Sequence, residues 1–211
     1  MKDTMTEDYW SRFPDSYEQN QEYVVGRELL DEIIRELNQL SELGEAVELG
    51  CGTGYFTVAI AENSRSVLAT DLSDSLLEAA KVRFRDYPAV TVEKENCLET
   101  SLAPESCDSV FMANLIHVLA NPTKALEESR RILRSGGRIV IVTFTGHGMS
   151  LWQKIKVGVR FARTWGKPPA NMRSLSPEDV GSMLEQTGFV VEQSKLLGNR
   201  TKAVVLVGRK R

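Results

Sequence analysis

The sequence has few of the residues that build disulfide frameworks and metal sites. Its 211 residues include three cysteines and two histidines. An odd and sparse set of cysteines is unsuited to a disulfide framework and is typical of proteins in a reducing compartment. No pair of cysteines or histidines has the spacing of a zinc site. We therefore expect a cytoplasmic protein without a metal ion.

Long apolar runs and an excess of positive charge are absent as well. No stretch reaches the roughly 20 apolar residues that a membrane span requires. Residues 1–8 hold acids instead of the apolar run of a signal peptide. The net charge is −3, which argues against a surface that coats nucleic acid. These absences predict no stable membrane insertion and no nucleic-acid partner, and they leave open whether the protein is a monomer or a homodimer.

Strand and helix patterns alternate along most of the chain. Short apolar segments rich in β-branched residues predict strands at 46–49, 66–70, 90–94, 109–113 and 138–144. Helical spacing predicts one helix over 21–40 and another from Asn121–Pro122 to Leu133, which ends at Gly136–Gly137. Such alternation indicates a parallel sheet with helices on both faces. Strands at 189–197 and 202–207, joined by Gly198–Asn199, then add an antiparallel pair.

A glycine-rich turn follows the first predicted strand and precedes a helix. Gly50, Gly52 and Gly54 allow a sharp turn and the close approach of a ligand. Asp71 ends the second strand about 20 residues later, where an acid can accept hydrogen bonds from ribose hydroxyls. The turn and Asp71 together predict a site for a nucleoside. Without Asp71, the glycines could also form a tight connection between a strand and a helix.

The residue before the turn distinguishes between two cofactors. A dinucleotide site has the spacing G-x-G-x-x-G and binds a pyrophosphate at the helix N-terminus. This chain has G-x-G-x-G, and the Glu48 carboxylate beside it would repel a pyrophosphate. A ligand with an ammonium and a sulfonium group would be attracted, which favours S-adenosyl-L-methionine over NAD.

Several motifs resemble the class I S-adenosylmethionine-dependent methyltransferases, in particular their small type 11 branch. The segments that carry the resemblance are 48–54, 71–73, 96–98 with 106–108, 113–118 and 131–137. The resemblance covers roughly Glu45 to Phe144 and the closing hairpin. It implies a Rossmann-like, doubly wound and mostly parallel seven-stranded α/β sheet with an antiparallel last strand. We expect one domain over 1–211, composed of an N-terminal lid and helix (1–44), a cofactor-binding core (45–145), a basic insert (146–175) and a closing helix and β-hairpin (176–211).

The resemblance also implies roles for individual residues. Glu48 would face the methionine amino group, the three glycines would cradle the methionine part, and Asp71 would bind the ribose. Leu72 would flank the adenine, and Asn96, where the family usually has Asp, would accept a hydrogen bond from the adenine amino group. Ala113 would offer its carbonyl to the methionine ammonium, and Tyr17 would belong to the lid. The complete expected set is Tyr17, Glu48, Gly50, Cys51, Gly52, Thr53, Gly54, Asp71, Leu72, Asn96, Cys97, Leu98, Ala113 and Asn114.

The implied reaction is an in-line displacement that leaves S-adenosyl-L-homocysteine. It depends mainly on alignment, and a general base is needed only for an acceptor that arrives protonated. His117 and His147 are the candidate bases, although each has packing or capping as the alternative. We expect a small-molecule acceptor whose O, N, S or C nucleophile is undetermined. The alternative is a catalytically silent S-adenosylmethionine-binding module that acts as a sensor or partner subunit.

The basic insert is the most unusual segment of the chain. It holds six cations, Lys154, Lys156, Arg160, Arg163, Lys167 and Arg173, and no acid. Leu151, Trp152, Ile155 and Val159 recur at helical spacing and predict an amphipathic helix. The insert could form a wall of the acceptor pocket and attract a carboxylate, a phosphate or an anionic membrane surface. Equally, it could be a solvated helix whose apolar stripe is buried.

Overall fold

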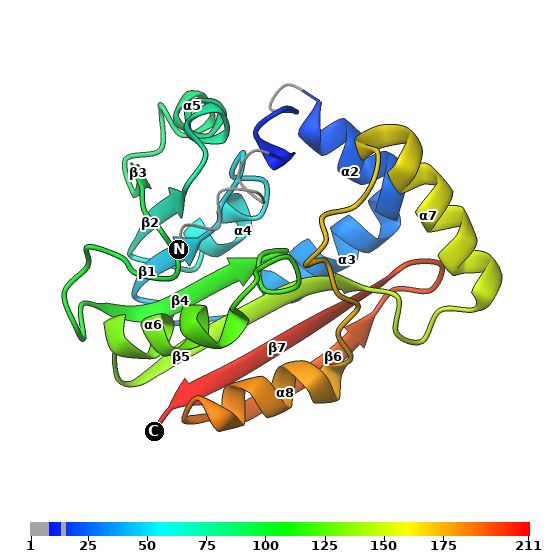
Figure 1. Ribbon diagram of the computed structural model, residues 1–211. Helices are drawn as coiled ribbons and strands as arrows, with labels where there is room; N and C mark the ends of the chain where they lie inside the picture. Colours follow the sequence, from blue (N-terminus) through cyan, green and yellow to red (C-terminus); the bar gives the residue numbers. More distant parts are fainter. Residues whose placement is uncertain (1–8, 14–15) are drawn as a thin grey trace.

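The computed structural model describes residues 9–13 and 16–211 and contains a seven-stranded sheet in the order β3-β2-β1-β4-β5-β7-β6 (Figure 1). The strands are β1 (Glu45–Leu49), β2 (Ser66–Asp71), β3 (Val90–Lys94), β4 (Cys107–Ala113), β5 (Leu133–Thr145), β6 (Phe189–Leu197) and β7 (Lys202–Lys210). Strands β1 to β5 pair in parallel, and β7 is antiparallel to both β5 and β6. The predicted fold class is therefore confirmed.

Helices cover both faces of the sheet. They are α2 (Tyr17–Val25), α3 (Arg27–Leu37), α4 (Thr57–Ala61), α5 (Asp74–Arg83), α6 (Pro122–Ile132), α7 (Leu151–Trp165) and α8 (Pro177–Gln186). Side chains of β5 alternate between two buried clusters: Val140 and Val142 join one, and Ile139 and Ile141 join the other. This alternation explains why β5 reads as a continuous apolar run, because both faces of the strand are buried.

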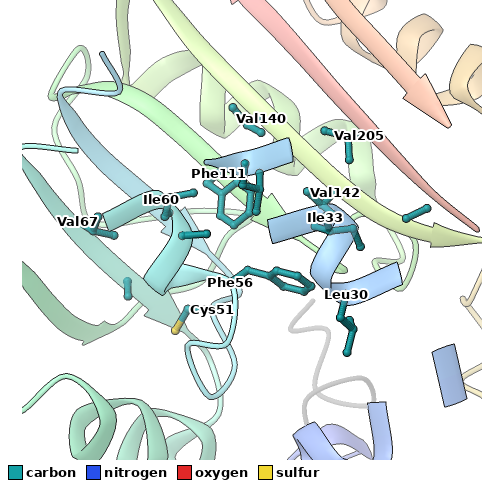
Figure 2. Close-up of a cluster of buried hydrophobic side chains, with 14 of the residues drawn as sticks. Leu30, Ile33, Cys51, Phe56, Ile60, Val67, Phe111, Val140, Val142 and Val205 are labelled. Carbon is teal, nitrogen blue, oxygen red and sulfur yellow. The ribbon is translucent and has the colours of Figure 1, made fainter. Parts of the chain in front are cut away.

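Figure 2 shows the first cluster, in which Leu30 and Ile33 of α3 lie near Val142 and Val205 of the sheet. Phe56 and Phe111 extend the same cluster toward α4. The second cluster joins α6 and α8 to the opposite face. Because β1 has β2 on one side and β4 on the other, the strand order reverses at its carboxyl end, where ligands bind in open α/β sheets.

The prediction of one helix over 21–40 is wrong. Two helices, α2 and α3, meet at Gly26, whose φ of 87° and ψ of 142° break the helical path. The apolar spacing continues across the break, so periodicity alone could not reveal it. A left-handed φ is inexpensive only for glycine, which makes Gly26 the point where the chain turns.

The prediction that Gly136–Gly137 ends the helix that begins at Asn121–Pro122 is also wrong. Helix α6 ends at Ile132, and Leu133 is already extended with ψ of 137°. The glycine pair belongs to the start of β5. A Cβ on Gly137 would lie 2.9 Å from the carbonyl oxygen of Asp108, so this glycine permits close packing against β4.

Helix α7 is present but does not bury its predicted stripe. Leu151, Trp152, Ile155 and Val159 are exposed, whereas Phe161 and Trp165 are buried. The buried pair packs edge-on against aromatic rings of the N-terminal segment, with 5.5 Å between the ring centroids of Trp10 and Trp165. This aromatic cluster determines which side of α7 faces the molecule, and the alternative of a buried stripe is wrong.

Candidate active site

A cavity lies at the carboxyl ends of β1, β2 and β4, and we call it the first cavity. Most of the predicted cofactor residues line it, namely Tyr17, Gly50, Gly52, Asp71, Leu72, Asn96, Cys97, Leu98, Ala113 and Asn114. All of them except Tyr17, which belongs to α2, come from the glycine turn, the ends of β2 and β4 and the loop after β3. The parallel sheet thus brings together segments that are up to about 60 residues apart in the sequence.

The glycine turn is held by backbone hydrogen bonds. The N–H groups of Gly50 and Cys51 both donate to the carbonyl oxygen of Thr70 at 2.8 Å. Gly52 has a φ of 56°, and no atom lies within 4 Å of the place where a Cβ would be. Gly54 is different, because its Cβ would lie 2.4 Å from Cε2 of Phe84. Gly52 therefore keeps open space along the cavity, whereas Gly54 lets the turn pack against α5.

Asp71 is fixed at the wall of the first cavity by two backbone donors. The N–H of Gly52 donates to Oδ2 at 2.9 Å, and the N–H of Ser73 donates to Oδ1 at 2.9 Å. Burial raises the pKa of Asp71, and these N–H donors oppose that shift. Each carboxylate oxygen retains a lone pair, so Asp71 can still accept hydrogen bonds from a pair of ligand hydroxyls.

Glu48 lies outside the lining of the first cavity. Its side chain is 1% exposed, and Oε2 accepts a hydrogen bond from Oγ1 of Thr57. Burial raises the pKa of Glu48 to about 8, although the Thr57 hydrogen bond opposes this. The carboxyl group is therefore buried beneath the turn, and the expected contact with a ligand ammonium stays a prediction.

Three further expected residues also lie outside the lining. Cys51 is buried in the first hydrophobic cluster (Figure 2), and burial raises the pKa of its thiol. Thr53 donates its hydroxyl to Oε1 of Glu18 at 2.8 Å. Together with Gly54, these residues support the turn on the side away from the cavity. Position in the motif alone does not distinguish such supporting residues from those that line the cavity.

The loop after β3 forms another part of the cavity wall. Oδ1 of Asn96 accepts a hydrogen bond from the N–H of Leu98 at 3.0 Å, which holds the loop in a turn. The adjacent Glu95 also lines the cavity and accepts hydrogen bonds from Ser101. Sequence reasoning missed Glu95, because its side chain resembles an ordinary exposed acid at a strand end.

The end of β4 is held against β5 by Asn114. Its N–H donates to the carbonyl of Val142 at 2.8 Å, and its Oδ1 accepts from the N–H of Phe144 at 3.1 Å. The φ of 55° is a left-handed conformation that asparagine tolerates better than most residues. Asn114 therefore sets the path of the chain at the cavity.

The N-terminal segment spans the first cavity from α7 to α5. The Tyr9 hydroxyl donates to the carbonyl of Trp165 at 2.8 Å, and the Ser11 hydroxyl donates to Oγ of Ser73 at 2.7 Å. Trp10 and Tyr17 line the cavity, whereas Tyr9 is buried among aromatic rings. Burial and the nearby Asp71 raise the pKa of Tyr17. Within this segment, Trp10 and Tyr17 therefore contribute to the cavity wall, and Tyr9 contributes to aromatic packing.

Other lining residues were not among the predicted ones: Ser73, Leu76, Leu115, Val118 and Leu119. Ser73 is the N-cap of α5 and accepts from the N–H of Leu76. The sequence pattern could have indicated Ser73 and Leu76, because they lie at the start of the helix that follows Asp71. The three residues after β4 lie in a segment without regular periodicity.

The two histidines lie away from the first cavity. His117 is 4% exposed, its Nδ1 is 2.9 Å from Oγ1 of Thr143, and burial lowers its pKa to about 4. His147 is exposed. Hydrogen bonds at the start of α8 lower the pKa values of Glu178 and Asp179, and the nearby His147 contributes to this shift. Neither lines the cavity, so this placement does not support a role as base for either of them.

A second cavity of about 390 Å³ lies between α7 and the sheet. Its wall is apolar, with Phe144, Val157, Phe161, Pro168 and Met172 among the contributors. Three cations, Lys154, Arg173 and Lys202, are the charged residues of its described lining. The N–H of Phe144 in this lining donates to Oδ1 of Asn114 in the lining of the first cavity, so a hydrogen bond connects the two walls.

Comparisons with known proteins identify the family. The methyltransferase domain model matches residues 47–141. An uncharacterized methyltransferase of Schizosaccharomyces pombe is 33% identical over 197 residues, which are 89% of this chain and 73% of the relative. The chain belongs to the S-adenosylmethionine-dependent methyltransferases.

Two further similarities place this methyltransferase among its relatives. A protein of Mycolicibacterium smegmatis, named probable S-adenosylmethionine-dependent methyltransferase, is 29% identical over 150 residues, and the chain spans only 53% of its length. A methyltransferase structure from Thermotoga maritima superimposes with a TM-score of 0.75 at 23% identity and covers 97% of this chain and 99% of the other. That structural likeness confirms the fold, including the antiparallel β7.

Proposed function

We propose that the first cavity binds S-adenosyl-L-methionine and that the enzyme transfers its methyl group to a small molecule in the second cavity. The observation that carries the proposal is the pairing of Asp71 with Gly52. The carboxylate is fixed by two N–H donors and retains acceptor capacity, and the space beside Gly52 is open to a ligand. A ribose on Asp71 would place its nucleoside base near Leu72 and Asn96, which line the same cavity.

The protein contributes mainly alignment to this reaction. When bound, S-adenosyl-L-methionine supplies a methyl group on a sulfonium, and the leaving thioether is neutral. In this proposal Trp10 and Tyr17, which line the first cavity, exclude water from it, and the hydrogen bond from Phe144 to Asn114 holds the walls of the two cavities together. Holding two reactants in line lowers the entropic part of the barrier.

The second cavity fits an acceptor with an apolar body and an anionic group. Its apolar wall favours burial of a hydrocarbon or aromatic surface, and Lys154, Arg173 and Lys202 favour a carboxylate or a phosphate. None of its described lining residues is a histidine, aspartate, glutamate, cysteine or tyrosine. The proposed acceptor is therefore one whose nucleophile carries no proton when it is bound, so that no general base is required.

The test of the proposed cofactor site is calorimetry with S-adenosyl-L-homocysteine. We expect the Asp71→Ala variant to bind this ligand at least about tenfold more weakly, because two charge-assisted hydrogen bonds are lost. Asp74→Ala is the matched control, since Asp74 is exposed and pairs with Lys94 outside the cavity. Equal affinity of the wild type and Asp71→Ala would remove Asp71 from the site, and no binding to the wild type would refute the proposal.

A further inference from the structure

Helix α7 presents an apolar face to solvent. Leu151, Trp152, Ile155 and Val159 are 72%, 73%, 45% and 44% exposed, respectively. At 3.6 residues per turn these four side chains fall within one arc of the helix. We call them the apolar face of α7. A contiguous exposed group of large apolar side chains marks an interaction site more often than a chance feature of a surface.

The opposite side of α7 is anchored to the rest of the molecule. Phe161 and Trp165 are buried against the N-terminal aromatic rings, and Lys154 and Val157 line the second cavity. In Figure 1, α7 (yellow) lies beside α2 at the periphery of the fold. The orientation of the helix is therefore fixed from within, and its apolar face is left outward.

Cations lie next to this apolar face. Lys156, Arg160 and Arg163 are exposed and follow the apolar arc on one side of the helix. The basic insert contains no acid, and none of its six cations forms an ion pair with an acid in residues 9–13 or 16–211. The guanidinium of Arg160 lies 5.6 Å from the ring centroid of Tyr23, which is itself half exposed. Positive charge is thus concentrated here, although the chain as a whole is acidic.

The combination of charge and apolar surface discriminates among partners. A second copy meeting this face by two-fold symmetry would bring two unpaired sets of cations together, which repel each other. A nucleic acid would use the cations but would leave the apolar face in water. An anionic lipid surface accommodates both, because the apolar side chains enter the headgroup boundary while the cations contact the phosphates.

We propose that α7 docks the protein peripherally on an anionic lipid surface through its apolar face and Lys156, Arg160 and Arg163. No helix within the described residues is long and apolar enough to cross a bilayer, so the helix would lie in the interface. This docking does not depend on the proposed function. A consequence that does rest on it is that an apolar acceptor could enter the second cavity from the lipid, since the same helix lines that cavity.

The test is flotation of the full chain with two kinds of vesicle, phosphatidylcholine alone and phosphatidylcholine mixed with phosphatidylglycerol. We expect the protein to float only with the mixed vesicles and to be released by salt, because screening weakens surface electrostatics. The tryptophan emission should shift to shorter wavelength on binding, and Trp152→Ser should abolish the shift. Lys156→Glu combined with Arg163→Glu should weaken binding at least about tenfold, since each interfacial cation contributes on the order of fivefold.

Matched variants separate docking from general effects. Arg35→Glu with Arg85→Glu changes the net charge equally at two exposed cations elsewhere and should bind the mixed vesicles like the wild type. Val82→Ser with Tyr87→Ser is the corresponding control for Leu151→Ser with Trp152→Ser, because all four side chains are exposed. All variants should keep the circular-dichroism spectrum of the wild type, which shows that they fold and keeps this test independent of the cofactor proposal.

Three outcomes would overturn the docking proposal. The first is the absence of flotation with the mixed vesicles, and the second is an equal loss of binding in the control variants. The third is a concentration-dependent dimer that Leu151→Ser with Trp152→Ser dissociates while neither vesicle binds, which would assign the apolar face to a second copy of the chain.

Discussion

The glycines of the turn have different roles, although they belong to one sequence motif: one lines the cavity and another allows close packing. Gly52 and Gly54 both have a left-handed φ, of 56° and 80°. Only Gly52 lines the first cavity, whereas Gly54 is pressed against Phe84. Motif matching assigns both to ligand binding because spacing alone carries no information about which side of a turn faces the ligand.

Alanine substitutions should distinguish these two duties. We expect Gly54→Ala to lower the free energy of unfolding by roughly 2–4 kcal/mol, because it adds a strained φ and a clash with Phe84. Gly52→Ala should cost only about 1–2 kcal/mol, since its methyl group meets no protein atom. It should instead weaken S-adenosyl-L-homocysteine binding by about tenfold or more, because the methyl group occupies ligand space. Denaturant unfolding and calorimetry on both variants check this, and the same loss of stability in both would contradict it.

His117 shows how a residue suited to catalysis can serve packing. Its position after β4 agreed with the prediction, but its burial and its contact with Thr143 could not be read from spacing. Since burial lowers its pKa to about 4, against about 6.5 in an unfolded chain, the unfolded state binds more protons between these values. The stability that the neutral imidazole contributes is therefore present above pH 6.5 and is lost as the pH falls toward 4.

This linkage gives a measurable difference between the wild type and His117→Gln. The gap between their free energies of unfolding should fall by on the order of 3 kcal/mol from pH 6.5 to pH 4, because only the wild type must protonate a buried imidazole or unfold. Urea titrations at several pH values measure it. A gap that does not change with pH would show that His117 is not buried as a neutral group in solution.

At the scale of elements, the structure differs from the sequence prediction where one helix contacts another. Most strands begin and end close to the predicted residues, because β-branched runs are local signals, whereas β5 begins earlier, at Leu133. The break at Gly26 and the outward apolar face of α7 were not predictable in this way. Each depends on a partner, and α7 is oriented by Trp10 and Tyr9 from a distant part of the chain.

Two tryptophans on α7 allow a direct test of this arrangement. We expect Trp165→Ala to destabilise the protein by about 3–5 kcal/mol, as for other buried aromatic residues, and to weaken S-adenosyl-L-homocysteine binding. The binding loss should follow because Trp165 packs on Trp10 and Tyr17, which line the first cavity. Trp152→Ala, on the exposed face of the same helix, should change stability by less than about 0.5 kcal/mol and leave binding intact. Thermal unfolding and calorimetry provide both readouts, and equal effects of the two substitutions would refute the account.

For the molecule as a whole, sequence was most informative about the cofactor half. The glycine turn, Asp71 and the end of β4 lie on strand ends, and parallel strands bring such ends together whatever the loops do. The second cavity, which we propose for the acceptor, is lined by α7, the loop before α8 and residues of β5 and β7, which meet only in the folded chain. The second cavity and its three cations therefore could not be located from the sequence, although the basic insert had indicated an anionic ligand.

The Asn114–Phe144 hydrogen bond has a thermodynamic consequence for both cavities. Because Asn114 lines one and Phe144 lines the other, one hydrogen bond between the end of β4 and β5 links the walls of the two cavities. A ligand that orders this contact lowers the entropic cost for the second ligand, and the resulting cooperativity must be reciprocal. The factor by which one bound ligand raises the affinity for the other is thus the same whichever of them binds first.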